Sequence, residues 1–255
     1  MSRKGVAREH GPDIDAHQRG LLARLNNSEW RAPIYSELVA RDIRRFGKPV
    51  TVLEIGCGMG FDGDVSLQRQ MAERADRYIG VEPDRDVEPE PIFTELIRTP
   101  LESAGLEPGS VDVAYSIMVM EHLEEPIAFV EAIHRALRPG GVYWGFTVDR
   151  RHWYTYVANA LTRLNLKSAY LDLLSGRRRG AGRYHDYPTA YRINCPRDLR
   201  RYEKLFTRVD SWNVGPFDSA AHYAPRALRS LVRGIERIRV RAGAPRTDFV
   251  VRVVR

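Results

Sequence analysis

Short apolar runs alternate along the chain with stretches of helical periodicity. The apolar runs, which predict strands buried on both faces of a sheet, are 50–55, 78–81, 111–116 and 142–148. Apolar positions three and four residues apart predict helices over 65–77 and 126–137, while residues 92–97 fit either a short helix or a strand. The order strand, helix, strand, helix, strand predicts βαβ units and a parallel sheet.

The flanking segments complete one predicted domain over residues 29–255. Before the first strand we expect a helix over 29–46, preceded by a loose basic arm at 1–28 with a short helix near 21–25. The predicted cofactor-binding half is 50–148, and an insert of about 149–195 follows it. The predicted C-terminal elements are a helix at 196–205, a strand at 208–214, a helix from 225 to 243 and a strand at 249–254.

Composition excludes several classes of protein. Hydrophobic residues make up 43% of the 255 positions and charged residues 29%, a mix that can bury a full core. No run of 18 apolar residues predicts a transmembrane span, and the first residues lack the apolar segment of a secretory signal. Two cysteines without a CxxC pair argue against a disulfide scaffold or a zinc-finger framework, and favour the reducing cytoplasm; no metal-binding residues are expected.

Charge is unevenly distributed. The net charge is +7, yet residues 50–149 carry 19 acidic and 7 basic side chains, while 150–225 and 226–255 have excess charges of +8 and +7. A nucleic-acid-binding protein would carry a more uniform basic coat, so this pattern argues against nucleic acid as a partner. The acidic and basic blocks are expected to do different work.

The glycine-rich turn at 56–63 allows two interpretations. Residues 58–63 fit G-x-G-x-x-G, and Glu82 lies 19 residues past the last glycine, which is typical of dinucleotide binding. The alternative uses glycines 56, 58 and 60, entered directly from Glu54. An acid there can accept a hydrogen bond from a ligand ammonium group or anchor the loop, whereas it would repel a pyrophosphate. Glu82 suits ribose hydroxyls in either case, so both ligands share an adenosine.

Four segments taken together favour the second interpretation. Residues 50–60, 78–84, 109–123 and 137–142 resemble, in order, the motifs of class I S-adenosylmethionine (SAM)-dependent methyltransferases, in particular the UbiE/type-11-like small-molecule branch. The resemblance implies a Rossmann-like, doubly wound α/β fold with a seven-stranded, mostly parallel sheet and an antiparallel last strand. It also implies SAM as the cofactor.

The resemblance further implies a set of cofactor contacts. The residues expected to hold the methionyl part are Glu54, Gly56, Cys57 and Gly58, and Gly60 is also expected to contact the cofactor. Glu82 would bind the ribose, Pro83 would lie against the adenine, and Ser116 and Ile117 would flank the sulfonium. Pro100 stands where an acid usually binds the adenine amino group, so Glu102 or a backbone group is expected to replace that contact, and Leu101 is also expected at the cofactor. Asp64 is expected to cap the helix that follows.

Candidate catalytic and acceptor-binding residues follow the fourth strand. His122 either buttresses the site or acts as the general base that a hydroxyl acceptor needs, and His185 is a second candidate base. The aromatic insert suits a polar, ring-shaped acceptor such as a sugar, including an anionic one. The residues predicted to bind it are Tyr154, Arg183, Tyr184, Tyr187 and Tyr191.

We therefore expect a methyltransferase that acts on a hydroxyl of a small polar acceptor, such as a sugar, glycan or natural product. An RNA methyltransferase and a catalytically silent cofactor-binding scaffold are the alternatives. The helix at 225–243 carries an apolar stripe and an arginine stripe. We expect it to pack on the sheet with its arginines in water, and contact with an anionic membrane surface is the alternative.

Overall fold

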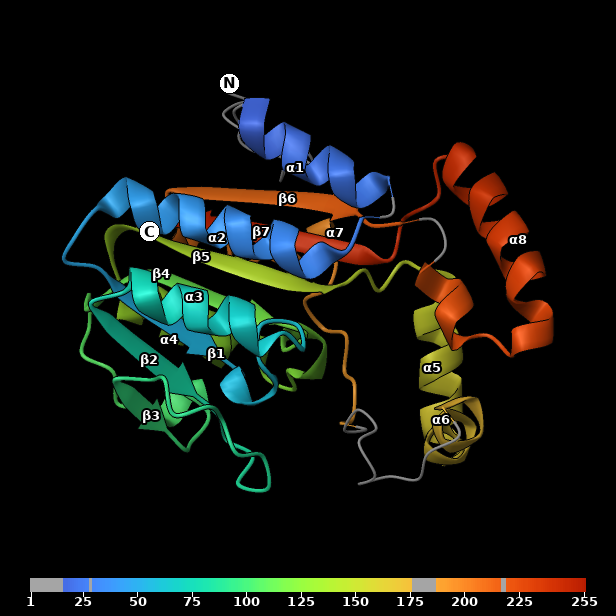
Figure 1. The fold of residues 1–255 in the computed structure, drawn as a ribbon, viewed down its shortest axis with the longest axis horizontal. Helices are drawn as coiled ribbons and strands as arrows, with labels where there is room; N and C mark the ends of the chain where they lie inside the picture. The colour runs from blue at the N-terminus through green and yellow to red at the C-terminus, as the bar shows by residue number, and fades with distance from the viewer. Residues whose placement is uncertain (1–15, 28, 176–186, 217–218) are drawn as a thin grey trace.

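A seven-stranded sheet forms the centre of the computed structural model, which describes residues 16–27, 29–175, 187–216 and 219–255 (Figure 1). The strands are β1 (Thr51–Ile55), β2 (Arg77–Val81), β3 (Glu95–Ile97), β4 (Val111–Ile117), β5 (Leu137–Val148), β6 (Arg208–Val214) and β7 (Asp248–Val254). Their order is β3-β2-β1-β4-β5-β7-β6, and β7 runs antiparallel to both of its neighbours. This confirms the predicted doubly wound fold with an antiparallel last strand.

The register aligns the carboxyl ends of the central strands. Ile55 at the end of β1 pairs with Val81 of β2 on one side and with Ser116 of β4 on the other. The chain order reverses at β1, because β2 and β3 lie to one side of it and β4 and β5 to the other. Ligands of open α/β sheets bind at such a reversal, outside the carboxyl ends of the strands.

Helices cover both faces of the sheet because its strands are apolar on both sides. The helices are α1 (Ala16–Asn26), α2 (Arg31–Phe46), α3 (Val65–Arg74), α4 (Pro126–Ala136), α5 (Trp153–Arg163), α6 (Lys167–Ser175), α7 (Pro196–Leu199) and α8 (Arg229–Arg241). Successive strand residues alternate between two cores: Val52 packs in the core beneath α2 and α3, and Leu53 in the core beneath α4 (Figure 1). Glu54 therefore faces the same side as Val52.

Several predicted boundaries shift. Helix α3 ends at Arg74, three residues early, because β2 already begins at Arg77. Strand β5 begins at Leu137, since that residue pairs with Val111 ahead of an irregularity in the ladder. The helix predicted over 196–205 is one turn, α7, followed by a 3-10 turn. Residues 95–97 are a strand, and α2 and the Asp64 cap of α3 are confirmed.

The described part of the predicted arm is a packed helix. Leu21, Leu22 and Leu25 of α1 are buried in the core shared with α2. The short helix expected near 21–25 is confirmed and extends over Ala16–Asn26. It packs on the core where a loose segment was expected, because three leucines at helical spacing supply an apolar face. Residues 1–15 lie outside the described part of the chain.

Helix α8 does not pack on the sheet as predicted. It stands beside α5, beyond the carboxyl ends of the strands, and its apolar stripe is exposed (Figure 1). The prediction was wrong because periodicity identifies an apolar face without identifying what lies opposite. Within the described ranges, no helix combines the length and apolar composition needed to cross a lipid bilayer.

Candidate active site

The glycine-rich loop that follows β1 lies directly against the end of β2. Gly56 adopts a left-handed conformation with φ 75°, and its N–H donates to the Val81 carbonyl at 2.8 Å. A Cβ on Gly58 would come within 2.2 Å of Val87 Cγ1 and 2.8 Å of Glu82 Oε2. Glycine is therefore required there, because the side chains of Val87 and Glu82 pack directly against the Gly58 backbone.

Glu82 meets this loop at the carboxyl end of β2. Its Oε2 accepts from the Gly58 N–H at 2.9 Å, and its Oε1 accepts from the Asp84 N–H at 3.0 Å. The side chain is buried, while Pro83 beside it is exposed. The two sequence-predicted ligand contacts, glycine loop and acid, are thus brought together. A carboxylate with two oxygens in this position can accept from two neighbouring hydroxyls.

Glu54 anchors the loop from below. Its Oε2 accepts from the hydroxyls of Tyr115, at 2.8 Å, and of Tyr78, and its Oε1 accepts from Gln68 Nε2 at 3.0 Å. The same amide donates to the Cys57 carbonyl at 2.8 Å. Burial raises the pKa of Glu54 to about 7, against the opposing effect of the hydrogen bonds. Of the two roles predicted for this acid, the contacts show the anchoring one.

Two predicted cofactor residues turn their side chains into the protein. Cys57 is fully buried, and burial raises the pKa of its thiol far above the ordinary value. The Ser116 hydroxyl is also buried and lies 2.6 Å from the Tyr143 hydroxyl. Only their backbone atoms can therefore face a bound cofactor. Ile117, one residue further along β4, is half-buried.

The turn after Pro100 lies apart from the glycine loop. Leu101 is buried and Glu102 is half-buried, and both line a cavity of about 260 Å³ between this turn and α4. No residue of the glycine loop lines that cavity. Glu102 lies two residues after Pro100, which stands at the sequence position of the usual adenine-binding acid. The side chain of Pro100 itself has no hydrogen-bond acceptor.

The end of the insert returns across the carboxyl edge of the sheet. The Tyr187 hydroxyl donates to Asp84, which follows β2. The backbone N–H groups of Ala190 and Tyr191 donate to the Glu121 carbonyl, after β4, at 2.7 and 3.0 Å. Residues 187–195, called the strap here, therefore cover the place where β2 and β4 end.

His122 is held by the strap. Its Nδ1 lies 2.6 Å from the Pro188 carbonyl oxygen, and its ring meets that of Tyr187 edge-on at 5.8 Å. A carbonyl accepts only, so Nδ1 carries the proton and Nε2 keeps its lone pair in the neutral ring. Within the described residues Nε2 makes no hydrogen bond. The other candidate base, His185, lies outside the described residues, as do Arg183 and Tyr184.

A buried polar chain lies beneath the strap. Glu121 Oε2 accepts from the Thr147 hydroxyl at 2.6 Å. The Thr147 hydroxyl oxygen in turn accepts from Asn194 Nδ2 at 2.6 Å. Burial raises the pKa of Glu121.

Two residues near the strand ends have a strained backbone. Tyr191 has φ 51°, a conformation that is rare for residues other than glycine, and Met118, just after β4, has φ 54°. Such strained residues gather at functional sites.

Aromatic residues line the inner side of the insert. Tyr154 of α5 stacks on Tyr223 with ring centres 5.7 Å apart and hydrogen-bonds with Tyr191. The structure thus brings two of the predicted acceptor residues, Tyr154 and Tyr191, together, while Tyr187 contacts the His122 ring and Asp84. Tyr223 carries no motif in the sequence, and only the fold identifies it.

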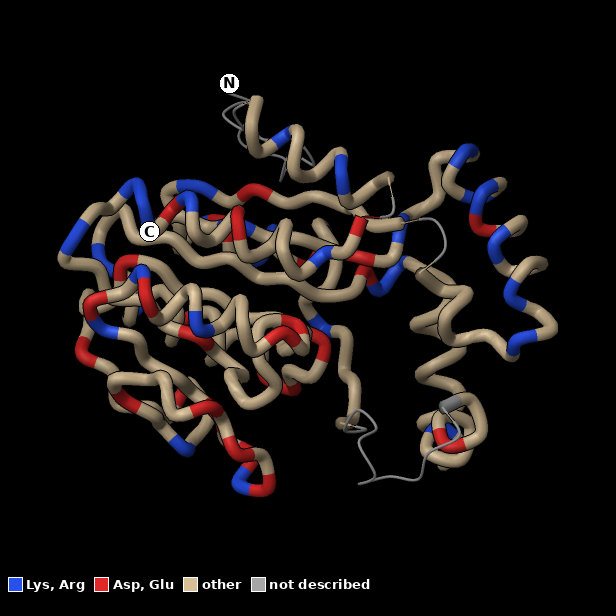
Figure 2. Tube along the Cα trace, in the orientation of Figure 1, with Lys and Arg blue, Asp and Glu red and all other residues tan. Residues whose placement is uncertain are grey.

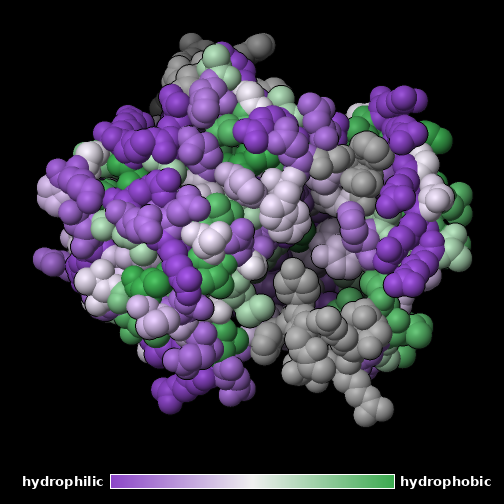
Figure 3. Space-filling view, in the orientation of Figure 1, coloured by the Kyte–Doolittle hydropathy of each residue, from purple (hydrophilic) through white to green (hydrophobic). Residues whose placement is uncertain are grey.

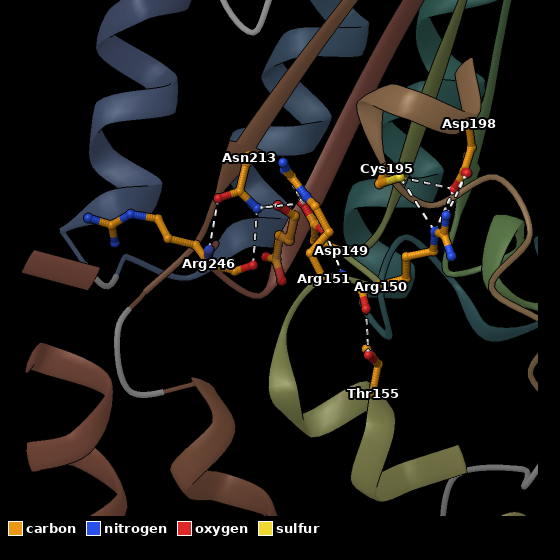
Figure 4. Close-up of polar contacts among 9 residues, drawn as sticks. Asp149, Arg150, Arg151, Thr155, Cys195, Asp198, Asn213 and Arg246 are labelled. Carbon is orange, nitrogen blue, oxygen red and sulfur yellow. Dashed lines mark hydrogen bonds and ion pairs between the residues drawn. The ribbon is translucent and has the colours of Figure 1, made fainter. Parts of the chain in front are cut away.

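The two ends of the insert are fastened to each other (Figure 4). Arg150, just after β5, binds Asp198 of α7 at 2.7 Å and lies 3.4 Å from Cys195 Sγ. Asp149 is fully buried and accepts from Asn213 of β6 at 2.8 Å. The insert therefore leaves and rejoins the sheet through a closed neck.

An ion pair that the sequence did not indicate ties α2 to the glycine loop. Arg31 Nε and Nη2 donate to the two carboxylate oxygens of Asp62 at 2.7 and 2.8 Å. Arg31 Nη1 also lies 3.6 Å from Asp248, whose carboxylate accepts from the Tyr35 hydroxyl at 3.0 Å. Asp62 has φ 52°. Two isolated charges 31 residues apart give no sequence signal, so only the structure shows this clamp.

Comparison with known proteins agrees with this geometry. A family model described as a methyltransferase domain matches residues 28–209. Ubiquinone biosynthesis O-methyltransferases of Idiomarina loihiensis and Paraburkholderia xenovorans are each 32% identical, over 41% and 39% of this chain. The matches cover 44% and 45% of those proteins, so the chain spans less than half the length of these relatives.

A solved structure shows the same fold. The SAM-dependent methyltransferase of Archaeoglobus fulgidus superposes with a TM-score of 0.51 at 13% identity, covering 86% of this chain and 94% of that one. Because the family model matches well over half of the sequence, the chain belongs to the methyltransferase domain family. The class I SAM-dependent methyltransferase assignment made from the four sequence motifs is confirmed.

Proposed function

We propose that this protein transfers a methyl group from SAM to a hydroxyl oxygen of a small polar acceptor, such as a sugar, glycan or natural product. The observation that carries the proposal is the His122 ring, fixed at the carboxyl edge of the sheet through Nδ1, with no hydrogen bond to Nε2 from any residue that the structure describes. A base contributes when the acceptor must lose a proton, as a hydroxyl must. The names of the two relatives also specify transfer to oxygen.

The residues at the edge of the sheet fit SAM. The absence of a Cβ at Gly58 lets the glycine loop lie directly against Glu82, so that the loop and this acid form one surface suited to the cofactor. Glu82 presents two carboxylate oxygens beside it, suited to the ribose hydroxyls. The methyl group that SAM supplies is electrophilic because it is bonded to a sulfonium. Glu54 and Gln68 hold the loop from below, so the cofactor surface is positioned in advance.

His122 would act on the acceptor. As the acceptor oxygen takes the methyl group, it loses its proton, and Nε2 of His122 is placed to receive that proton. The Pro188 carbonyl keeps Nδ1 protonated and would stabilise the imidazolium that forms. The strap lies over the strand ends and supplies Tyr187 and Tyr191, which with Tyr154 would bind the polar acceptor and shield it from water.

A conservative variant tests this role. In His122→Asn the side-chain amide can still donate to the Pro188 carbonyl, but the base at the Nε2 position is gone. We expect kcat to fall about 100- to 10,000-fold with a sugar or phenol acceptor. The SAM dissociation constant, measured by calorimetry, should stay the same.

His134→Asn is the matched control, because His134 lies on α4 and its ring contacts Phe206 away from the strap. His134→Asn should leave kcat and the SAM dissociation constant unchanged. Equal kcat for His122→Asn and the wild-type protein would remove His122 as the base.

We also place the protein in the cytoplasm in this proposal, because Cys57 and Cys195 are unpaired.

A further inference from the structure

Helix α8 is attached to the molecule by a polar face. Glu236 is buried and lies 2.9 Å from His152 Nε2, accepts from the indole N–H of Trp153, and pairs with Arg239 at 2.7 Å. An ordinary surface helix buries its apolar stripe and leaves charged residues in water. In α8 the charged residue is inside, and the apolar stripe is the part that faces outward.

The exposed stripe continues onto the neighbouring helices. Leu231 is 60% exposed and Ile238 69%, while Leu173 of α6 is 83% exposed. Apolar side chains gather along the outer margin of the molecule, over α8 and the α5–α6 region (Figure 3). The outer face is defined here by Leu164, Leu166, Leu173, Leu231, Ile235 and Ile238. Contiguous apolar surface of this kind marks an interaction site.

The elements that carry the outer face are strongly basic. Residues 153–175 and 219–246 together hold nine Lys and Arg residues and two acidic ones, of which Glu236 is buried in the contacts above. Arginines follow α8, while acidic residues are frequent in the half of the molecule built from residues 50–149 (Figure 2). An anionic surface would attract the outer face and repel the acidic half, which fixes one orientation.

The combination of exposed apolar side chains and basic charge on the outer face distinguishes among three possible partners: a second copy of this chain, a nucleic acid and an anionic bilayer. A second copy of the same face would oppose seven excess positive charges with seven more. A nucleic acid would satisfy the arginines and leave the six apolar side chains without contacts. An anionic bilayer accommodates both, because its headgroups attract basic residues and its acyl boundary takes up apolar ones.

We propose that the outer face docks on the surface of an anionic lipid bilayer. Leu231, Ile235 and Ile238 of α8, with the leucines of α5 and α6, enter the boundary between headgroups and acyl chains. Arg226 and Arg233 contact the headgroups from the water side. Helices α5, α6 and α8 stand beyond the carboxyl ends of the strands (Figure 1), so docking turns this edge of the sheet toward the bilayer. This proposal stands whatever the acceptor is.

Vesicle co-sedimentation of the full chain tests the proposal. Wild-type protein should bind vesicles of phosphatidylcholine containing 30% phosphatidylglycerol, and should bind vesicles of pure phosphatidylcholine about tenfold more weakly. Ile238→Ser should lower the partition coefficient about five- to tenfold, because one large apolar side chain no longer enters the bilayer. Arg226→Glu/Arg233→Glu should lower it further, and 0.5 M salt should weaken binding of the wild-type protein.

Ile127→Ser is the matched control, because Ile127 is 53% exposed on α4, in the acidic half. It should bind like the wild-type protein, and circular dichroism establishes that both serine variants fold. Absence of binding to anionic vesicles would overturn the proposal, as would equal partition of Ile238→Ser and Ile127→Ser. Self-association lost in Ile238→Ser, without vesicle binding, would identify a second copy as the occupant and refute the lipid assignment.

Discussion

The buried carboxyl group of Glu54 should make the stability of this protein depend on pH. Its pKa is about 7 in the folded chain, against 4.5 ordinarily, because burial outweighs the hydrogen bonds from Tyr78, Tyr115 and Gln68. Between pH 4.5 and 7 the folded chain binds this proton and the unfolded chain does not. The free energy of unfolding must therefore fall as the pH rises through that window.

The size of the effect follows from the two pKa values. At about 1.36 kcal/mol per pH unit, the full difference corresponds to about 3 kcal/mol. Most of it, about 2.5 kcal/mol, falls between pH 5 and pH 8. Glu54→Gln removes the titrating group and keeps an oxygen that can accept from the two tyrosine hydroxyls. Gln68 has a buried Oε1 without a partner, which can accept from the new amide.

Urea unfolding at pH 5, 6, 7 and 8 measures the effect. The difference in unfolding free energy between Glu54→Gln and the wild-type protein should shift in favour of the variant by about 2.5 kcal/mol across this range. Tyr115→Phe provides a contrast, since it removes a hydrogen bond that lowers the pKa of Glu54. In Tyr115→Phe the pKa of Glu54 should therefore be higher, and the fall of the unfolding free energy with rising pH should continue to a higher pH than in the wild-type protein. Parallel curves for Glu54→Gln and the wild-type protein would refute this reasoning.

Two further predictions concern the glycine loop. Gly58→Ala should weaken SAM binding at least about tenfold by calorimetry, because its Cβ would displace Val87 and the loop; unchanged affinity would argue that the cofactor lies elsewhere. Asp62→Asn, in which asparagine still tolerates the left-handed backbone, should lower the unfolding free energy by about 2 kcal/mol and raise the KM for SAM, since Arg31 loses its two charge-assisted hydrogen bonds to Asp62 and keeps the longer contact to Asp248. Glu29→Gln, which breaks an exposed ion pair, should cost less than about 0.5 kcal/mol in the same urea titration.

The part of the fold that repeats locally was predictable from the sequence. Apolar runs and helical spacing identify the βαβ units, and the run after Pro49 leads directly into the glycine loop. Parallel strands end at one edge of the sheet, so Glu82 was expected to lie near Gly58. In the structure, Glu82 Oε2 accepts from the Gly58 N–H at 2.9 Å. These inferences depend on neighbours in sequence and on a single topological rule.

The remaining features depend on contacts between distant residues. The attachment of α8 rests on Glu236 and His152, 84 residues apart, and nothing in the arginine and leucine stripes indicates that a glutamate is the buried residue. The strap has no periodicity, so its path over His122 and the pairing of Tyr154 with Tyr191 emerge only in three dimensions. The clamp of Arg31 on Asp62 is hidden for the same reason.

The closed neck of the insert has a consequence for how this protein can change through evolution. Arg150 binds Asp198, and Thr147 binds Asn194, so both ends of the insert are fixed to the sheet within a few residues of each other. The chain between these two fastenings is therefore a loop whose ends are fixed on the sheet. Doubling the length of a flexible loop costs about 0.6 kcal/mol of folding free energy. Descendants of this protein can exchange or lengthen the segment between these two fastenings while residues 50–148 keep their structure.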